Sequence, residues 1–327
     1  MPGLFYETAD VLVFDPVAGN RTATRAALYT LGFRCIETVA TLEDLAAVLA
    51  RTPPDLAVCE AQGSEARLCE VIQSMRQGLM GYNPFVVIMV TAWDKTTTLV
   101  KRILDSGADD LLLRPFSTTL LGIRIETHIE RRKGFVVTHN YVGPDRRSDP
   151  RRASNVKLFE PPNSLRMRTK ERMNTEESAS RLEIQLKAAR ETLAREKVRR
   201  DAFQIGVLWR LLEDGIPDDD GRAVDPAKLG HIAKQIVARD YEGKPAEATR
   251  WCESVLAGVE GLDKGVDRDA SLHLLGHAAV SLSQALQPEM SSEEYVRQLN
   301  EVVAMIRARG AAEAASKAAR KASRPAG

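Results

Sequence analysis

The stretch DLAVCE, residues 55–60, is a short apolar run that ends in an acid. Three further apolar runs lead to residues that carry chemistry: VLVFD (11–15) to an acid, VVIMVT (86–91) to a hydroxyl, and DLLLRPF (110–116) to a base. Apolar runs with little alternation are typical of parallel strands covered on both faces. Since ligand sites of such sheets lie at the carboxyl ends of the strands, we expect these four polar side chains to form one site.

Between residues 10 and 131, such runs alternate with segments of helical periodicity. We predict strands at 10–15, 34–39, 55–60, 85–91 and 109–113, and helices at 21–31, 42–50, 65–77, 95–106 and 117–131. Five units of this kind predict an α/β fold, a doubly wound five-stranded parallel sheet of flavodoxin-like order.

The residues after 131 differ in composition and predict three further parts. From Arg131 to Arg172, twelve Lys/Arg stand against four Asp/Glu, so residues 132–173 are expected to form a basic Arg/Pro-rich linker. Residues 174–309 are expected to form an all-α helical module, and 310–327 a disordered basic tail. The predicted helices of the module are a long one to about residue 212, then 226–240, 245–259, 268–287 and 291–309.

A leucine-rich stripe over residues 182–193 has the 4-3-4 spacing of a coiled coil. The next two seam positions are Glu196 and Arg200, so the coiled-coil pattern spans only two heptads. The apolar residues between 203 and 211 are instead expected to pack against neighbouring helices of the module.

Composition limits the class of protein. A chain of 327 residues is long enough for about two domains. No segment approaches the roughly 18 apolar residues of a membrane helix, and the first residues lack a secretory signal pattern. The four cysteines have no CxxC spacing and are expected to be reduced core thiols. We expect a cytoplasmic protein with no membrane partner.

Several motifs together resemble the receiver domain of bacterial two-component response regulators, the CheY-like family, over about residues 9–131. Each lies in the family's order and spacing: Asp15, Glu60, Thr91 with Ala92, SGADD at 106–110 and RPF at 114–116. A later stretch, YVGPDRR at 141–147, is similar to segments that follow bacterial receivers. Its arginines Arg146 and Arg147 are expected either to fold back onto acids such as Asp109 and Asp110 or to stay in solvent.

The resemblance implies a phosphorylation pocket, from which this sequence departs. In the family, two adjacent acids and an acceptor aspartate hold Mg²⁺, a lysine pairs with the phosphoryl group, and a hydroxyl closes onto it. Here Pro16 follows Asp15, Glu60 occupies the phospho-acceptor position, and Arg114 replaces the lysine. Thr91 is at the switch position. The metal site of Asp15 and Glu60 is expected to be weak or lost, and we expect no cofactor.

The extra methylene of Glu60 displaces its carboxylate, and an error of about 1 Å can cost roughly 10²-fold in rate. Arg114 can pair with that carboxylate in a two-pronged manner that lysine cannot. One hypothesis is a pseudo-receiver held in one state, with Glu60 salt-bridged to Arg114 and near Thr91. The alternatives are a decayed pocket in which Glu60 is an ordinary surface carboxylate, and residual phosphorylation.

His273 and His277 stand at a spacing that can bind a metal from one helix face, but no acid or cysteine completes a ligand set nearby in sequence. Histidines on a partly buried helix face are the favoured interpretation. A phosphotransfer histidine is disfavoured because no Lys-Gly pair follows it.

The combined interpretation is a response-regulator-like signalling protein of a two-component phosphorelay, without enzymatic activity. It is expected to act independently of phosphorylation through protein–protein contacts. The resemblance implies a histidine kinase, another regulator or a chemotaxis component as partner, and a homodimer through residues 95–131. The alternative is a nucleic-acid-associated regulator using the basic linker and tail, which is disfavoured because residues 173–306 are not basic overall.

Overall fold

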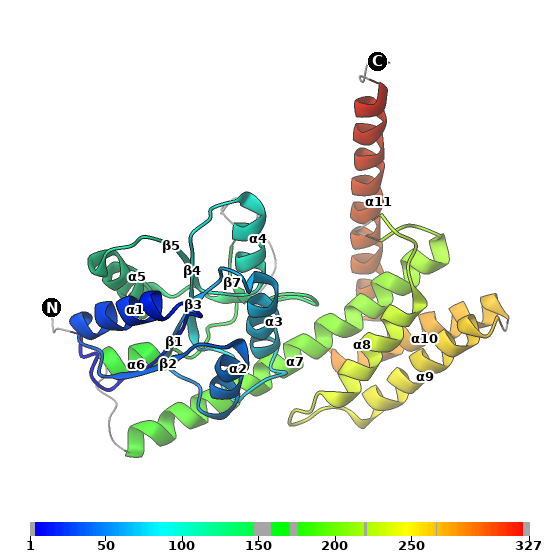
Figure 1. Ribbon diagram of the computed structural model, residues 1–327. Helices are drawn as coiled ribbons and strands as arrows, with labels where there is room; N and C mark the ends of the chain where they lie inside the picture. The colour runs from blue at the N-terminus through cyan, green and yellow to red at the C-terminus, as the bar shows by residue number, and fades with distance from the viewer. Residues whose placement is uncertain (1–3, 147–157, 171–175, 219–220, 266, 323–327) are drawn as a thin grey trace. The chain divides into compact units, whose positions relative to one another are not determined.

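The structure is a computed structural model that describes residues 4–146, 158–170, 176–218, 221–265 and 267–322 (Figure 1). Its internal contacts divide the chain into two units, Met1–Leu193 and Ala194–Gly327. None of the helices in the described ranges is long and apolar enough to cross a membrane.

The first unit contains a five-stranded parallel sheet. Its strands are β1 (Asp10–Phe14), β2 (Cys35–Val39), β3 (Leu56–Glu60), β4 (Val87–Ala92) and β5 (Asp110–Leu113). Their order in the sheet is β2-β1-β3-β4-β5, the flavodoxin-like order that the alternating pattern predicts. The predicted doubly wound sheet is therefore confirmed. The register aligns Glu60 with Thr91 on the neighbouring strand.

Helices cover both faces of this sheet. They are α1 (Ala18–Leu31), α2 (Leu42–Arg51), α3 (Glu65–Arg76), α4 (Thr97–Asp105) and α5 (Thr118–Arg131). Side chains alternate between faces along a strand, so Val11 and Val13 pack with α1 and α5 residues, whereas Leu12 and Phe14 pack with α2 and α3 residues. Each face thus has its own hydrophobic core.

The described part of the predicted linker is folded onto the first unit. Strands β6 (Phe135–Val137) and β7 (Val142–Pro144) form an antiparallel hairpin, and α6 (Ser164–Lys170) contacts α5. Three phenylalanines explain this difference from the predicted boundaries, because the ring of Phe85 lies 6.2 Å from that of Phe135 and 5.4 Å from that of Phe159. These aromatic rings leave solvent when the segment folds back.

Two of the arginines that suggested a solvated linker, Arg132 and Arg146, are partly buried and bind residues of the first unit. Arg132 donates two hydrogen bonds to Asp109, from Nε to Oδ1 (2.8 Å) and from Nη2 to Oδ2 (3.1 Å). The fully buried Arg76 donates from Nη2 to Oδ2 of the same carboxylate (2.8 Å). Arg146 donates to the carbonyl of Ala108, so it folds back onto the residue next to Asp109. Arg147 lies outside the described residues.

The long helix α7 (Glu176–Asp214) runs through the division between the units. Its leucine-rich stripe packs within the chain: Leu186, Ala189 and Leu193 share a buried cluster with the β6–β7 hairpin. The 4-3-4 spacing therefore reflects an intramolecular contact surface, and a coiled-coil partner is not needed to bury it.

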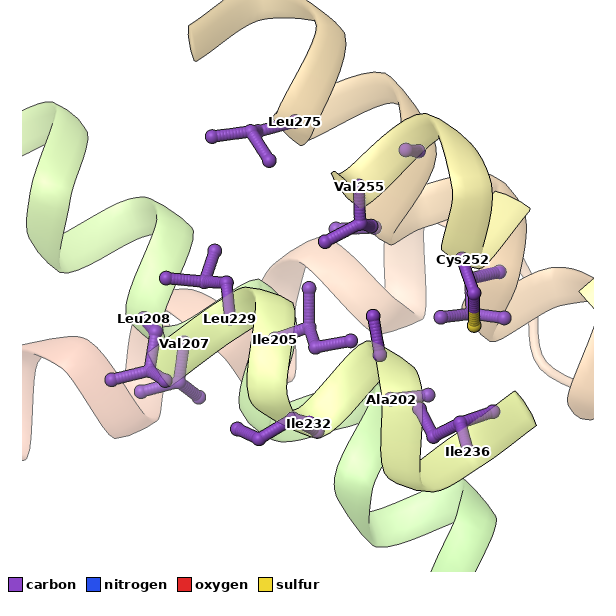
Figure 2. Packing of buried hydrophobic residues seen from close by; sticks show 14 of the residues in the cluster. Ala202, Ile205, Val207, Leu208, Leu229, Ile232, Ile236, Cys252, Val255 and Leu275 are labelled. Carbon is purple, nitrogen blue, oxygen red and sulfur yellow. The ribbon is translucent and has the colours of Figure 1, made fainter. Parts of the chain in front are cut away.

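The second unit is all helical, as predicted. It combines the end of α7 with α8 (Pro226–Ala238), α9 (Ala246–Asp263), α10 (Arg268–Leu286) and α11 (Ser292–Ala322). Figure 2 shows side chains from α7, α8, α9 and α10 gathered between the helices, and the expected packing of residues 203–211 is present. Helix α11 continues to Ala322, well into the segment predicted as a disordered tail.

Close helix contacts in the second unit depend on glycine. A Cβ on Gly276 of α10 would overlap the indole of Trp209, which is fixed by a 2.9 Å bond from Nε1 to the carbonyl of Leu272. We predict that Gly276→Ala destabilises the second unit, because overpacking costs about 1–3 kcal/mol. The higher helix propensity of alanine offsets roughly 1 kcal/mol of this cost. Urea unfolding followed by circular dichroism measures this difference.

Gly230 of α8 provides the matched control. A Cβ there would make only ordinary contacts, the nearest at 3.5 Å from Leu256. Gly230→Ala is expected to leave stability unchanged or raise it by up to about 1 kcal/mol. Equal losses in both variants would show that helix backbone strain, and not the contact with Trp209, sets the effect.

Candidate functional site

Four strand ends bring the predicted site residues together. Asp15 follows β1, Glu60 ends β3, Thr91 lies in β4, and Arg114 follows β5. Because parallel strands present their carboxyl ends at one edge of the sheet, side chains up to 99 positions apart in sequence come within hydrogen-bonding distance.

Glu60 is the centre of this site and is only 1% exposed. Its Oε2 accepts hydrogen bonds from Thr91 Oγ1 (2.7 Å) and Arg114 Nε (2.6 Å), and its Oε1 accepts one from the backbone N–H of Gln62 (3.0 Å). The expected ion pair with Arg114 is present, and Glu60 is not the surface carboxylate that a decayed pocket would show.

Arg114 bridges the two acids. Its Nη2 donates to Asp15 Oδ2 (3.2 Å) and to Thr24 Oγ1 (3.0 Å), and its guanidinium lies over the ring of Phe116 at 4.9 Å. The guanidinium is therefore fixed by two carboxylates, a hydroxyl and an aromatic face. Charge-assisted bonds of this kind are among the stronger interactions inside proteins.

Helix α1 contributes residues that sequence reasoning missed. Thr24 is buried and holds Arg114, while Arg21 Nη1 donates to the backbone carbonyl of Asp15 (2.6 Å). The N–H of Val17 donates to Asp15 Oδ1 (2.8 Å). The one available signal was a threonine on an otherwise apolar helix face, which is too common to identify a ligand of the site.

Burial raises the pKa of Asp15, and the Val17 amide and the Arg114 guanidinium offset this only in part. The carboxyl of Asp15 is fully buried and has a second acid, Glu60, nearby, which also favours its protonated form. The site therefore contains more acid than its single bridging cation neutralises.

The residues present do not fit a Mg²⁺ ion. The ion prefers octahedral oxygen coordination, but Asp15 Oδ2 and Glu60 Oε2 both already accept from Arg114. Pro16 cannot supply the adjacent carboxylate, and its side chain has no oxygen. The guanidinium of Arg114 occupies the electrostatic position of a cation between the two acids.

The histidines and cysteines of the described residues form no competing metal site. The part of the chain that the structure describes contains no group of three or more His, Cys, Asp or Glu arranged to hold a metal. His277 instead meets the ring of Trp251 edge-on, with centroids 5.3 Å apart. Cys59, Cys69 and Cys252 are free and buried as expected, whereas Cys35 is free and exposed.

The strand order and the polar strand ends together decide the fold. The first unit has the receiver fold. No family model and no curated protein matches the chain. Solved receiver structures are similar to it, each over nearly the whole matched domain and just over a third of this chain.

One similar structure is a signal receiver domain of a two-component histidine kinase from Clostridium thermocellum, with 17% identity and a TM-score of 0.34 over 38% of this chain and 98% of that one. A response regulator from Thermotoga maritima has 22% identity and a TM-score of 0.33, over 37% and 96%. A chemotaxis response regulator of Vibrio cholerae has 19% identity and a TM-score of 0.32, over 36% and 96%.

Proposed function

We propose that this protein is a response-regulator-like signalling protein whose receiver-like unit works without phosphorylation, through protein–protein contacts. The buried contact chain Thr91–Glu60–Arg114 carries the proposal. In a working receiver the hydroxyl and the base meet the phosphoryl group. Here both already bind the carboxylate that stands in the acceptor position.

The geometry opposes phosphoryl transfer to Glu60. An acceptor oxygen must attack in line with the leaving group, with the developing charge neutralised by metal and cation. Glu60 Oε2 is occupied by two donors, and its Oε1 by the Gln62 amide. The pocket thus resembles a receiver whose switch contacts are satisfied permanently, and no enzymatic role is proposed for it.

The expected partners follow from this role: a histidine kinase, another regulator or a chemotaxis component. Residues 95–131 carry exposed apolar side chains suited to such contacts, or to a homodimer, at Leu113, Leu120 and Ile123. The nucleic-acid alternative is weaker than the composition suggested, because Arg132 and Arg146 of the basic segment are bound to the first unit.

Phosphorylation by acetyl phosphate with Mg²⁺, followed by intact mass spectrometry, tests the proposal. The wild type is expected to gain no phosphoryl group. Glu60→Asp alone is expected to remain poorly labelled, because Arg114 still bridges the acids. The triple variant Pro16→Asp/Glu60→Asp/Arg114→Lys restores the acceptor, the second acid and the lysine. It is expected to be labelled at position 60 by at least about tenfold more than Glu60→Asp.

Beryllofluoride binding, read from the NMR signal of Thr91, provides an independent check that the triple variant is folded and responsive. Labelling of the wild-type chain at Glu60 would overturn the proposal. An inert triple variant that keeps its native amide spectrum would show that losses beyond residues 16, 60 and 114 disabled the pocket.

A further inference from the structure

The strand β2 forms one edge of the sheet. It pairs with β1 on one side, and no other described strand lies beside it. Three of its five residues are exposed: Cys35, Glu37 and Thr38. An open edge presents backbone N–H and C=O groups that a further strand can bind.

Two hollows flank this edge, one on each face of the sheet. On the α1 side a hollow of about 570 Å³ is lined by Arg21, Arg25, Tyr29 and Thr38, among others. On the α2 side a hollow of about 360 Å³ is lined by two acids, Asp10 and Glu37, and by residues that include Val48, Pro53 and Pro54. A strand added at β2 would place alternate side chains into these two hollows.

The α1-side hollow is strongly biased in charge. Its lining residues include two arginines and no acid. A third cation, Arg34, lies over the ring of Tyr29 at 4.2 Å and donates to the carbonyl of that residue. Arg25 is exposed, whereas Arg21 is partly buried with its Nη1 on the carbonyl of Asp15, so a side chain that enters from solvent meets the guanidinium of Arg25 first. Carboxylates are the complementary groups.

We propose that the β2 edge binds an extended acidic peptide segment of a partner protein, which joins the sheet as a sixth strand. Main-chain hydrogen bonds to β2 hold the segment, as in other cases of strand addition. Acidic side chains at alternate positions enter the hollow of Arg21 and Arg25. The intervening side chains are apolar and lie against Val48, Pro53 and Pro54.

A second copy of this chain is a poor occupant of the same edge. Pairing β2 with β2 would offer Ile36 and Thr38, but no carboxylate, to the arginine-lined hollow. It would also bring the Arg25 side chains of the two copies towards one another, and like charges in such contacts are unfavourable. Charge complementarity therefore favours a different, acidic segment.

The inference rests on the proposed protein-binding role but not on the Glu60 pocket. Fluorescence anisotropy of the full chain with a labelled eight-residue peptide alternating Glu and Val provides the test. Hydrogen exchange read by mass spectrometry gives the location, since bound peptide is expected to slow the amides of residues 35–39. Arg25→Glu is expected to weaken binding about tenfold or more, with a steep dependence on salt.

Three controls make the result specific. Lys101→Glu makes the same change of charge at an exposed site on α4 and is expected to leave affinity unchanged. A Lys/Val peptide tests charge, and a Glu/Val peptide with proline at two of the valines removes strand hydrogen bonds. Both are expected to bind at least about tenfold more weakly.

The inference would be overturned if the Lys/Val peptide bound as tightly as the Glu/Val peptide, or if Arg25→Glu bound the Glu/Val peptide as tightly as the wild type does. Unchanged hydrogen exchange at residues 35–39 on adding peptide would overturn it as well. Slowing of these amides with protein concentration alone, without peptide, would identify a second copy as the occupant and overturn it too. None of these outcomes depends on the phosphorylation assay, so the failure of either proposal can be recognised separately.

Discussion

Asp109→Asn is expected to destabilise the first unit by about 3–5 kcal/mol, because it leaves two buried guanidiniums without their counter-charge. Asp109 is buried and binds Arg76 and Arg132 as well as the backbone N–H of Ile88 (2.8 Å). The side chain of Arg76 has no exposed surface, so it cannot turn to water when the carboxylate is removed. Asparagine preserves the shape but supplies only one acceptor.

Hydrogen exchange in urea, read on peptides of the first unit, measures this loss separately from the second unit. Asp110→Asn is the matched control, since the neighbouring acid meets the half-exposed Arg124 at 3.4 Å. Asp110 also contacts His128 at 3.3 Å, and since Arg124 stays half in solvent these contacts are expected to contribute only about 0–1 kcal/mol. If both substitutions cost the same, the buried cluster is not the source of stability.

The pH dependence of the first unit's stability gives a second measurement of the cluster of Asp109, Arg76 and Arg132. Burial alone would raise the pKa of Asp109, but the Arg132 and Arg76 guanidiniums outweigh it and hold the pKa below the usual 3.8. A lowered folded-state pKa means that the stabilisation is present above the unfolded pKa and is lost as pH falls through the folded one. Asp109→Asn has no carboxylate to protonate at this position, so the part of the stability loss at low pH that comes from Asp109 is expected to be absent in the variant.

Arg114→Met is expected to cost about 3–5 kcal/mol in the first unit at neutral pH, which is the usual cost of breaking a buried ion pair. The side chain of Arg114 is 8% exposed, and its removal leaves Asp15 and Glu60 buried without the cation that bridges them. Methionine fills a similar volume, so the loss reports charge more than packing.

Acidification is expected to reduce the stability that Arg114→Met loses. The pKa of Asp15 is already raised by burial, and Arg114 is one of the groups that lower it, so removing the arginine raises it further. A raised folded-state pKa contributes stability that is present below the unfolded value and is lost as pH rises through the folded value. The variant is therefore expected to be closest to the wild type near pH 4 and furthest from it near pH 7.

A double-mutant cycle separates the pair from its surroundings. Glu60→Gln removes one of the two carboxylates, and in that background Arg114→Met is expected to cost at least about 1 kcal/mol less. An unchanged cost would mean that Arg114 stabilises the unit through Asp15, Thr24 and Phe116 rather than through Glu60.

The sequence predicted the sheet and the gathering of Asp15, Glu60, Thr91 and Arg114 for a physical reason. Each of these residues ends or follows an apolar run, and the geometry of parallel strands converts that local position into proximity. The ion pair of Glu60 and Arg114 could be predicted because the two side chains are oppositely charged and long enough to meet at the carboxyl edge of the predicted sheet. Thr24 was not predictable in this way, because its role depends on where α1 crosses the strand ends.

The fold of residues 132–146 could not be inferred from composition. A high count of arginine usually indicates solvated chain, and the carboxylate that binds Arg132 lies 23 residues earlier, in the loop before β5. Gly143 shows the same dependence on distant structure: a Cβ there would lie 2.7 Å from the Cα of Gly107. Both contacts join residues that are far apart in sequence, so neither can be predicted from the local sequence.

The stripe of α7 also affects how the chain folds during synthesis. Phe135, Val137 and Val142 belong to a core cluster that is completed only by Leu193, made 51 residues after Val142 (193 − 142). At about 5–20 residues per second, the ribosome leaves this apolar surface uncovered for roughly 3–10 s. Until α7 emerges and covers it, the hairpin presents apolar side chains that are buried in the finished fold.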